Sequence, residues 1–380
     1  MFQKTSSDIQ DFNLFMATGS KQYLEFLLIC NVKNILISYA YPEPWQMKGL
    51  IEKNNVNLIC DSGAFTSWNL SQKTRREEAY DMIGGEPMWQ LLNQKGREEI
   101  LAKVDEIGNW KKHLVNIDKY LEHLNKYKDI IWRGVNLDVI PGEQGSVPTE
   151  EQIIEAAEQG WKNYKYLKER GWDTIHVYHQ GEPIWVLNRM LDECDYIGVS
   201  PCNDSSEKAK MEWLDISFRH IMNYDYSKNP RIQKGQIIKT HGFAVTSKRL
   251  VERYPWYTVD SSSYSLTAAM GNILTRYGRI YVSDQNLHDE DHINNKPLEI
   301  KEHIDSYLKN KIGYGIQSMM ETSKEDECKC PKCQTPVMTT QKTQAYKPRN
   351  FANICFYLDL QDKRRKEGPT LAFMNQGTLL

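Results

Sequence analysis

Eight short runs rich in apolar and β-branched residues recur along this chain of 380 residues, and most of them precede a stretch with helical spacing. Such alternation predicts βα units around a parallel sheet, and eight units are the number found in a (β/α)8 barrel, or TIM barrel. The runs cover residues 32–39, 56–61, 132–138, 174–180, 196–200, 236–241, 256–260 and 279–283. We therefore expect an α/β chain built on such a barrel.

Two further features suggest how the rest of the chain is organised. A long, charged stretch at 72–128 is expected to form a helical insertion after the second strand, and a cysteine-rich segment follows the last one. We expect a catalytic barrel at 1–320 and, at 321–380, a zinc-binding subdomain with a C-terminal helix. The net charge of −2 excludes a globally basic surface for nucleic acid. Neither a signal peptide nor an apolar run of about 20 residues is visible, so we expect a cytoplasmic protein without a membrane partner.

Polar side chains stand at the carboxyl ends of six of these runs, which is where TIM barrels place their active sites. They are Asp61, Asp138, Gln180, Ser200, His241 and Asp260. Each could instead be an ordinary polar residue at the start of a loop. Paired carboxylates suit glycosidic-bond chemistry, in which one attacks the anomeric carbon and the other handles the proton of the leaving group. A third carboxylate could accept hydrogen bonds from the donor edge of guanine, and Phe65 could either stack on a flat base or pack in the core.

Three cysteines lie within six residues, at Cys328, Cys330 and Cys333. This spacing predicts a structural Zn²⁺ site, because three thiolates can face one tetrahedral ion. A fourth ligand is needed, and Cys355 is the only cysteine beyond the cluster. The alternatives are a chance cluster of structural cysteines and, for Cys355, a thiol buried on a helix. A second polar run, His288-Asp289-Glu290-Asp291-His292, could bind a metal but reads better as a solvated loop.

Seven short motifs, taken in order, resemble the tRNA-guanine transglycosylase superfamily, and within it the phage-type, DpdA-like 7-deazaguanine transglycosylases that act on DNA. The resemblance runs from Asp61 to about Arg365, and its order of motifs is more specific than any single motif. The motifs are Asp61-Ser62-Gly63-Ala64-Phe65, Asn136-Leu137-Asp138, His179-Gln180-Gly181, Tyr196-Ile197-Gly198-Val199-Ser200-Pro201, His241-Gly242-Phe243-Ala244-Val245, Val259-Asp260 and the cysteine cluster. The family is a TIM barrel with a small zinc subdomain near its end.

The resemblance implies a role for each matched residue. Asp260 would attack C1′ and expel guanine, leaving a covalent glycosyl-enzyme intermediate, and Asp61 would be the acid/base for the leaving and incoming bases. Ser62, Asp138 and Gln180 would hydrogen-bond the base, Gly198 would lie in a loop lining the pocket, and Phe65 and His241 would sandwich the base. The residues predicted to bind the base are Ser62, Phe65, Asp138, Gln180, Gly198, Ser200, His241 and Gly242. Cys328, Cys330, Cys333 and Cys355 would hold the zinc.

The chain also departs from the tRNA enzymes. Ala64 stands where they usually have a second glycine, Thr66 where they have Gln, and Ala352 where a histidine zinc ligand is expected. These departures favour DNA over tRNA as the nucleic-acid partner, with a 7-deazaguanine as the incoming base and, if the chain is phage-encoded, the host cytoplasm as its location. The alternatives are a tRNA enzyme, a non-catalytic nucleic-acid-binding subunit and a glycoside hydrolase.

Basic residues in two stretches could contact phosphates or could simply form solvated charged surfaces. The first comprises Lys342, Lys347, Arg349 and 363–366, and the second comprises Lys228, Arg231, Lys234 and Lys239. The sequence leaves open whether the chain forms a homodimer.

Overall fold

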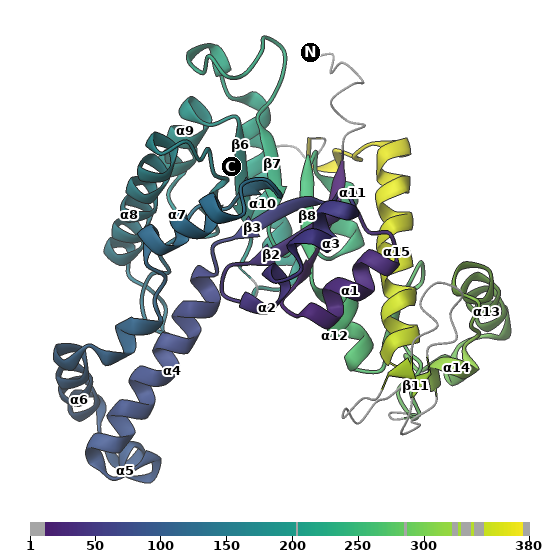
Figure 1. Ribbon diagram of the computed structural model, residues 1–380, viewed down its shortest axis with the longest axis horizontal. Coiled ribbons are helices and arrows are strands. Elements are labelled where there is room, and N and C mark those ends of the chain that lie inside the picture. The colour runs from purple at the N-terminus through teal and green to yellow at the C-terminus, as the bar shows by residue number, and fades with distance from the viewer. Residues whose placement is uncertain are drawn as a thin grey trace.

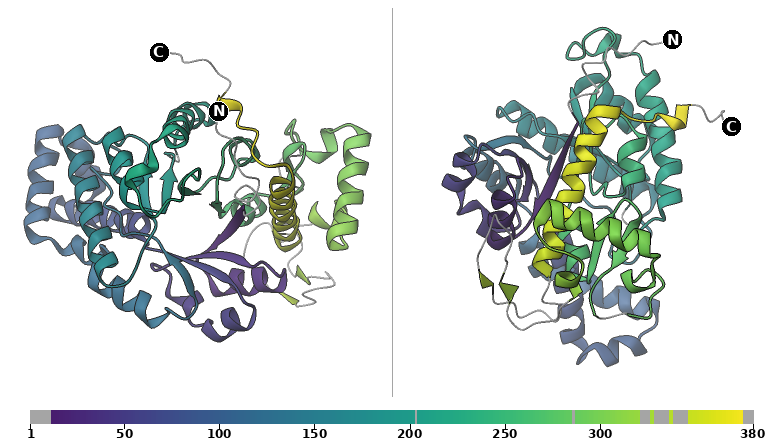
Figure 2. Two further views of the ribbon diagram at one scale, coloured as in Figure 1. Left: turned by 90° about the horizontal axis from the view of Figure 1, so that it is seen from above. Right: turned by 90° about the vertical axis from the view of Figure 1, so that its right-hand side faces the viewer.

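The computed structural model describes residues 12–202, 204–284, 287–320 and 346–374, together with the backbone of the paired two-residue strands β11 (Asp326–Glu327) and β12 (Pro336–Val337). Eight parallel strands form one curled sheet in the order β4-β3-β2-β1-β8-β7-β6-β5, with helices around its outside (Figures 1 and 2). The strands are β1 (Asn13–Thr18), β2 (Asn34–Ser38), β3 (Asn57–Asp61), β4 (Ile131–Gly134), β5 (His176–His179), β6 (Tyr196–Ser200), β7 (Lys239–Gly242) and β8 (Thr258–Ser261).

The two edge strands of this sheet approach each other just beyond the end of β4. Val135 and Ile175 form a single parallel bridge, and the Asn136 N–H donates to the carbonyl of Ile175 at 2.9 Å. The order of the strands around the sheet therefore follows the order of the chain, as it does in a TIM barrel. The expected α/β architecture is confirmed at this level: a curled, eight-stranded parallel sheet that is compatible with a TIM-like barrel.

The number of strands was predicted correctly, but one member of the set was wrong. Residues 279–283, expected as the eighth strand, mostly fall in β10 (Gly278–Tyr281), which pairs antiparallel with β9 (Asn272–Thr275) in a separate hairpin. The missing member of the sheet is β1, which the sequence analysis did not anticipate and which lies between β2 and β8. The helical insertion consequently follows the third strand of the sheet rather than the second.

Side chains from the strands form two apolar layers, one inside the curled sheet and one between the sheet and the helices. Along β1, Phe15 belongs to the inner cluster, whereas its neighbours Leu14 and Met16 belong to the outer one. This alternation follows from the two-residue period of a strand. The inner cluster is formed by Phe15, Leu36, Ile59, Val135, Ile175, Val177 and Tyr196. It fills the space below the carboxyl ends of the strands and supports the polar residues above it.

The predicted insertion is helical and begins earlier than expected, at the end of β3. In Figure 1, α4 leads away from the sheet to α5 and α6, and the chain then returns through α7. Arg75, on α4, is nearly buried and pairs with Asp105 and Glu143, so it ties α4 both to α6 and to the connection after β4. The elements are α4 (Ala64–Ile83), α5 (Glu86–Leu91), α6 (Gln94–Ile107), η1 (Asn109–His113) and α7 (Ile117–Lys126).

The remaining helices follow the strands or cover the C-terminal side. Those between strands are α1 (Lys21–Ile29), α2 (Pro42–Trp45), α3 (Lys48–Lys53), α8 (Glu150–Glu169), α9 (Ile184–Glu193), α10 (Glu207–Asn223), η2 (Tyr226–Lys228) and α11 (Lys248–Arg253). Those after β8 are α12 (Ser263–Ala269), η3 (Ile293–Asn295), α13 (Leu298–Ile312), α14 (Gln317–Met320), α15 (Tyr346–Glu367) and η4 (Ala372–Met374).

The long helix α15 packs against α12 and β1, and its basic residues are largely structural. Arg349 is fully buried and donates to the carbonyls of Ala268 and Met319, while Arg364 donates to those of Val251 and Tyr254. These two guanidinium groups hold α15 against the neighbouring segments and are too buried to contact phosphates. Neither role expected for Arg349 and Arg364, a phosphate contact or part of a solvated charged surface, was correct. Lys342, also in the first basic stretch, lies outside the described residues.

The second basic stretch lies mainly at the amino ends of the strands. Arg231 pairs with Asp173 and Asp195, which precede β5 and β6, and Lys239 is the first residue of β7. Parallel strands have all their carboxyl ends at one side of the sheet, so these residues lie at the side opposite the predicted site. They cannot serve as a phosphate contact next to the strand-end carboxylates.

Candidate active site

Asp61 is the last residue of β3, and a tight turn connects it to α4. Its Oδ2 accepts a hydrogen bond of 3.0 Å from the N–H of Gly63, which has a φ of 73°. A side chain at Gly63 would clash, since its Cβ would lie 2.8 Å from that of Ala40, so only glycine suits this left-handed turn. Burial raises the pKa of Asp61 to about 6, a rise that Ser38 and the Gly63 N–H oppose and that repulsion from Asp260 and Asp138 increases. Asp61 is therefore half protonated near pH 6, where an ordinary aspartate is almost fully ionised.

Asp260 lies on β8, nearly buried, and receives two hydrogen bonds on the same oxygen. The Nε2 of His241 is 3.2 Å from Oδ1, and the N–H of Ala244 donates to Oδ1 at 3.0 Å. Ala244 has a φ of 52°, a conformation that costs energy for any residue other than glycine and is concentrated at functional sites. The loop after β7 is therefore held in a strained shape that directs a donor at the carboxylate. Because both donors use Oδ1, Oδ2 is the oxygen available to a substrate.

A chain of buried polar groups behind Asp260 fixes the orientation of His241. The Nδ1 of His241 is 2.6 Å from the hydroxyl of Thr258, which also contacts the hydroxyl of Tyr196. Burial strongly raises the pKa of Tyr196, so this phenol keeps its proton and donates. In the tautomer with its proton on Nε2, His241 accepts from Thr258 at Nδ1 and donates to Asp260 at Nε2. With that tautomer, the donors run in order from Tyr196 through Thr258 and His241 to the carboxylate.

Asp138 follows β4 and is paired with a histidine that the sequence analysis did not assign. His179, the last residue of β5, has its Nε2 3.6 Å from Oδ2 of Asp138 and its Nδ1 3.2 Å from Glu182. Burial disfavours the imidazolium, but the two carboxylates outweigh this effect and raise the pKa of His179 to about 10. Burial also raises the pKa of Asp138, although the hydrogen bond from His179 opposes the rise. At neutral pH a cation therefore lies between Asp138 and Glu182.

The other predicted base-binding residues lie near these carboxylates with different degrees of exposure. Phe65, in the first turn of α4, is 57% exposed and stacks on Trp68 with 6.1 Å between ring centroids, so its face can receive a base. Gln180 accepts a hydrogen bond from the N–H of Cys202. The carbonyl of Ser200 accepts one from the N–H of Gln180. Ser62 is buried, and its hydroxyl accepts from the N–H of Ala64 at the start of α4.

Two expectations about this site need correction, those for Gly198 and His241, and base binding by Gly242 stays a prediction. Gly198 lies inside strand β6 rather than in a loop, and a Cβ there would come within 2.5 Å of the Phe243 ring, so its lack of a side chain makes room for that ring. Gly242 is likewise buried, with Val245 and Trp256 against it. His241 is fully enclosed and contacts Phe243 edge to face, so it does not offer a free surface on which a base could stack. Its geometry positions Asp260 instead.

The predicted zinc ligands are only partly within the described residues. Cys328, Cys330 and Cys333 lie outside them, and Cys355 is partly buried on α15. Within the described ranges, no group of three His, Cys, Asp or Glu side chains could hold a metal ion. In the 288–292 run, His292 is buried and bonds the carbonyl of Ser283, so it stabilises its own loop. The zinc site stays a prediction.

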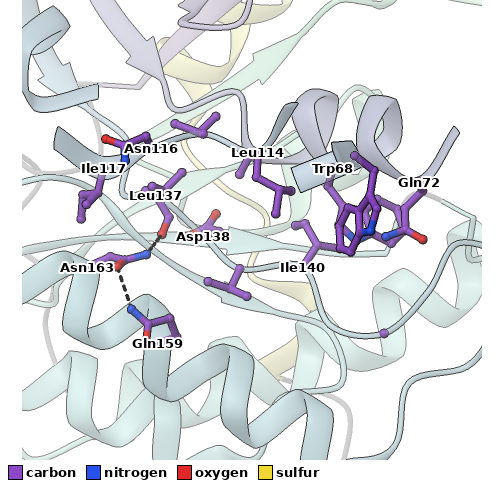
Figure 3. A pocket seen from close by; sticks show the side chains of 15 residues that line it. Trp68, Gln72, Leu114, Asn116, Ile117, Leu137, Asp138, Ile140, Gln159 and Asn163 are labelled. Carbon is purple, nitrogen blue, oxygen red and sulfur yellow. Dashed lines mark hydrogen bonds between the residues drawn. The ribbon is translucent and has the colours of Figure 1, made fainter. Parts of the chain in front are cut away.

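A cavity of about 470 Å³ lies beside Asp138, on the side of the insertion (Figure 3). Its walls come from α4, from the segment between η1 and α7, from the connection after β4, and from α8. Asp138 lines it, whereas Asp61 and Asp260 do not. This cavity was not anticipated, because its walls come from segments far apart in the sequence.

Comparison with models of known families finds no match, and comparison with curated proteins finds none either. Within the described residues, no helix combines the length and the apolar character needed to cross a membrane. The functional argument therefore rests on the site itself and on the resemblance of its motifs.

Proposed function

We propose that the chain is a transglycosylase that exchanges guanine in DNA for a 7-deazaguanine base, such as 7-cyano-7-deazaguanine. The observation that carries the proposal is the meeting of three carboxylates, from the ends of β3 and β8 and from just beyond β4: Asp260 and Asp138 both act electrostatically on Asp61. One carboxylate is held by donors and another retains its proton to a higher pH than an ordinary aspartate, which is the division of labour that double displacement at a glycosidic carbon requires.

The proposed reaction has two displacements. Oδ2 of Asp260 attacks C1′, the bond from C1′ to the base breaks with its electron pair going to the base, and protonated Asp61 supplies the proton that guanine needs to leave. The incoming 7-deazaguanine then gives a proton to Asp61 and attacks C1′, which releases Asp260. Water is neither consumed nor released, and both carboxyl groups return to their starting protonation states. The target nucleotide in a duplex must leave its base stack to reach the site.

The buried chain of donors behind Asp260 supports this role. Tyr196, Thr258 and His241 hold Oδ1 in one position, so the attacking oxygen is placed before substrate arrives. Such preorganisation avoids a rearrangement during the reaction. His179 acts similarly on Asp138, whose carboxylate is suited to accept hydrogen bonds from the N1–H and amino group of guanine. Phe65 offers a stacking face.

The finer features of the fold are part of the same proposal. We infer a complete TIM barrel closed between β4 and β5, followed by a C-terminal subdomain in which Cys328, Cys330, Cys333 and Cys355 hold a structural zinc ion. A zinc ion there would stabilise the segment between α14 and α15 and take no part in the chemistry.

An exchange assay tests the proposal. The purified chain is incubated with radiolabelled guanine and either duplex DNA or unmodified tRNA, and unlabelled 7-cyano-7-deazaguanine is then added as a chase. We expect label to enter DNA and to be displaced by the chase. Label in tRNA alone would support the alternative tRNA enzyme, and label in neither polymer would contradict the proposal and favour a non-catalytic subunit. The preference for DNA rests on the resemblance alone.

A further inference from the structure

The cavity beside Asp138 has the chemistry of a site for a flat, uncharged heterocycle. Its volume of about 470 Å³ lies within the range of roughly 300–1,000 Å³ that is usual for small-molecule sites. Its lining combines two indoles, several aliphatic side chains and four carboxamides, and Asp138 is the only ionisable residue among them. A phosphate would find no Lys or Arg in this lining, whereas a nucleobase would find both stacking surfaces and hydrogen-bonding groups.

Gln72 gives a specific reason to expect a ligand there. The residue is only 7% exposed, and its amide forms no hydrogen bond with any residue that the structure describes, so its polar atoms are left open to the cavity that it lines. Trp110, on another wall of the cavity, has a buried Nε1–H without a hydrogen-bond partner among the described residues. A buried donor without a partner is costly, and such groups call for an explanation. Gln72 lines the cavity one helical turn beyond Trp68 on α4, so the amide and the indole face the same space (Figure 3).

Other amides on the walls are partly committed to the protein and present complementary groups. Asn163 donates to the carbonyl of Leu137 and accepts from the amide nitrogen of Gln159, which leaves the Gln159 oxygen as an acceptor. The Asn116 oxygen caps α7, which leaves its amide nitrogen as a donor. A set of fixed donors and acceptors around a stacking surface is suited to the edge of a base.

The aromatic residues connect this cavity to the catalytic carboxylates. Phe65 follows the turn at Asp61, and it stacks on Trp68 with an interplanar angle of 25°. The two rings thus form a continuous apolar surface from the turn beside Asp61 to the cavity wall. We infer that the cavity binds a second nucleobase, that of a nucleotide adjacent to the target in the substrate strand. This inference rests on the proposed function.

A binding experiment tests the inference without any chemistry at the target. A short single-stranded DNA carries a stable abasic analogue at the target position and either natural bases or the same analogue at the neighbouring positions. The wild-type chain should bind the strand with natural neighbours about 5- to 100-fold more tightly, the range expected for stacking of one base on an aromatic side chain. Gln72→Leu and Trp68→Leu should reduce this preference, and Gln94→Leu, a matched change on the exposed surface of α6, should retain it.

A second titration, with free 7-cyano-7-deazaguanine, identifies the source of the base. If the cavity holds a strand base, Gln72→Leu leaves the stoichiometry for the free base unchanged. A fall from two bound bases to one would keep the nucleobase site but overturn its assignment to the strand. Equal binding of both strands by the wild-type chain, together with unchanged free-base binding in Gln72→Leu, would overturn the site altogether.

If the proposed function is wrong, the exchange assay fails while the binding preference does not. In that case exchange is absent or survives Asp260→Ala, while the preference for natural neighbours still depends on Gln72. Loss of that preference with exchange intact would overturn the second base site alone.

Discussion

The imidazole Nε2 of His241 lies 3.2 Å from Oδ1 of Asp260, and both side chains are buried at the carboxyl end of the parallel sheet. His241→Phe keeps an aromatic ring of similar size and removes the donor. Exchange should slow about 10- to 100-fold, since a hydrogen bond to a charged group contributes about 1.5–3 kcal/mol. The rate of single-turnover base release measures this loss directly.

A positioning role for His241 can be separated from a merely structural one. His241→Gln retains an amide donor and should recover part of the rate. His292→Phe removes a second fully buried histidine, which bonds the Ser283 carbonyl, and should lower stability without slowing base release. Equal rates in wild type and His241→Phe would show that the donor chain does not act on Asp260.

The raised pKa of Asp61 makes a prediction about stability. The folded carboxyl holds its proton up to pH about 6, whereas an ordinary aspartate releases it near 3.8. Between these values the folded state binds more protons, so the free energy of unfolding falls as the pH rises. The full loss is about 3 kcal/mol, because each pKa unit corresponds to about 1.36 kcal/mol.

Asp61→Asn should therefore be more stable than wild type at pH 8, by up to about 3 kcal/mol, and nearly equal to it near pH 4. Denaturant unfolding at both pH values measures the difference. The same variant should lose exchange, since the amide cannot deliver the proton. A variant less stable than wild type at pH 8 would contradict the desolvated position assigned to Asp61.

The imidazolium of His179 between Asp138 and Glu182 should stabilise the fold in a pH-dependent way. Its pKa is about 10 in the folded chain, well above the ordinary 6.5, so its contribution is complete below pH 6.5 and is lost as the pH rises through 10. His179→Gln should be destabilised at pH 6.5, and its deficit should shrink toward pH 10. The comparison is made by urea unfolding across that range.

His123 provides the matched control for this series. Burial lowers its pKa to about 4, so it stays neutral throughout the same range. The stability difference between wild type and His123→Gln should not change between pH 6.5 and 10. A deficit of His179→Gln that is likewise constant would mean that His179 carries no charge in the folded state.

Zinc removal tests the C-terminal prediction. Cys355→Ser should lower the bound zinc and the melting temperature, because metal ligation contributes directly to the stability of such sites. Cys194→Ser, a change at the buried cysteine that caps the C-terminus of α9, should lower the melting temperature but leave the zinc content unchanged. Unaltered zinc in Cys355→Ser would return Cys355 to a packing role on α15.

The sequence correctly predicted an eight-stranded parallel sheet but misassigned one of its strands. Residues 279–283 have strong β propensity, yet propensity does not say which partner a strand will have, and here the partner is β9 in a hairpin. β1 contains Asn, Met and Ala and follows a polar segment, so its local signal was weak. Its place is set by tertiary pairing with β2 and β8.

The carboxylates were predictable because each stands at the end of an apolar run. The side chains that position these carboxylates were not predicted. This is so although His179 and Glu182 are only three residues apart and Thr258 precedes Asp260 by two. Tyr196 and Thr258 are 62 residues apart and meet only because β6, β7 and β8 are neighbours in the sheet. The predicted stacking role of His241 was wrong for the same reason, because its enclosure by Phe15 and Phe243 arises only when the strands pack together.

The most direct test of the account is capture of the covalent intermediate on Asp260. The chain is mixed with DNA without an incoming base, denatured rapidly and digested, and the peptide that carries the sugar is identified by mass spectrometry. The account predicts a DNA adduct on the peptide containing Asp260, its absence in Asp260→Ala, and its disappearance from wild type when 7-cyano-7-deazaguanine is added before denaturation. Base exchange by wild type without any adduct, or an adduct on another residue, would contradict it.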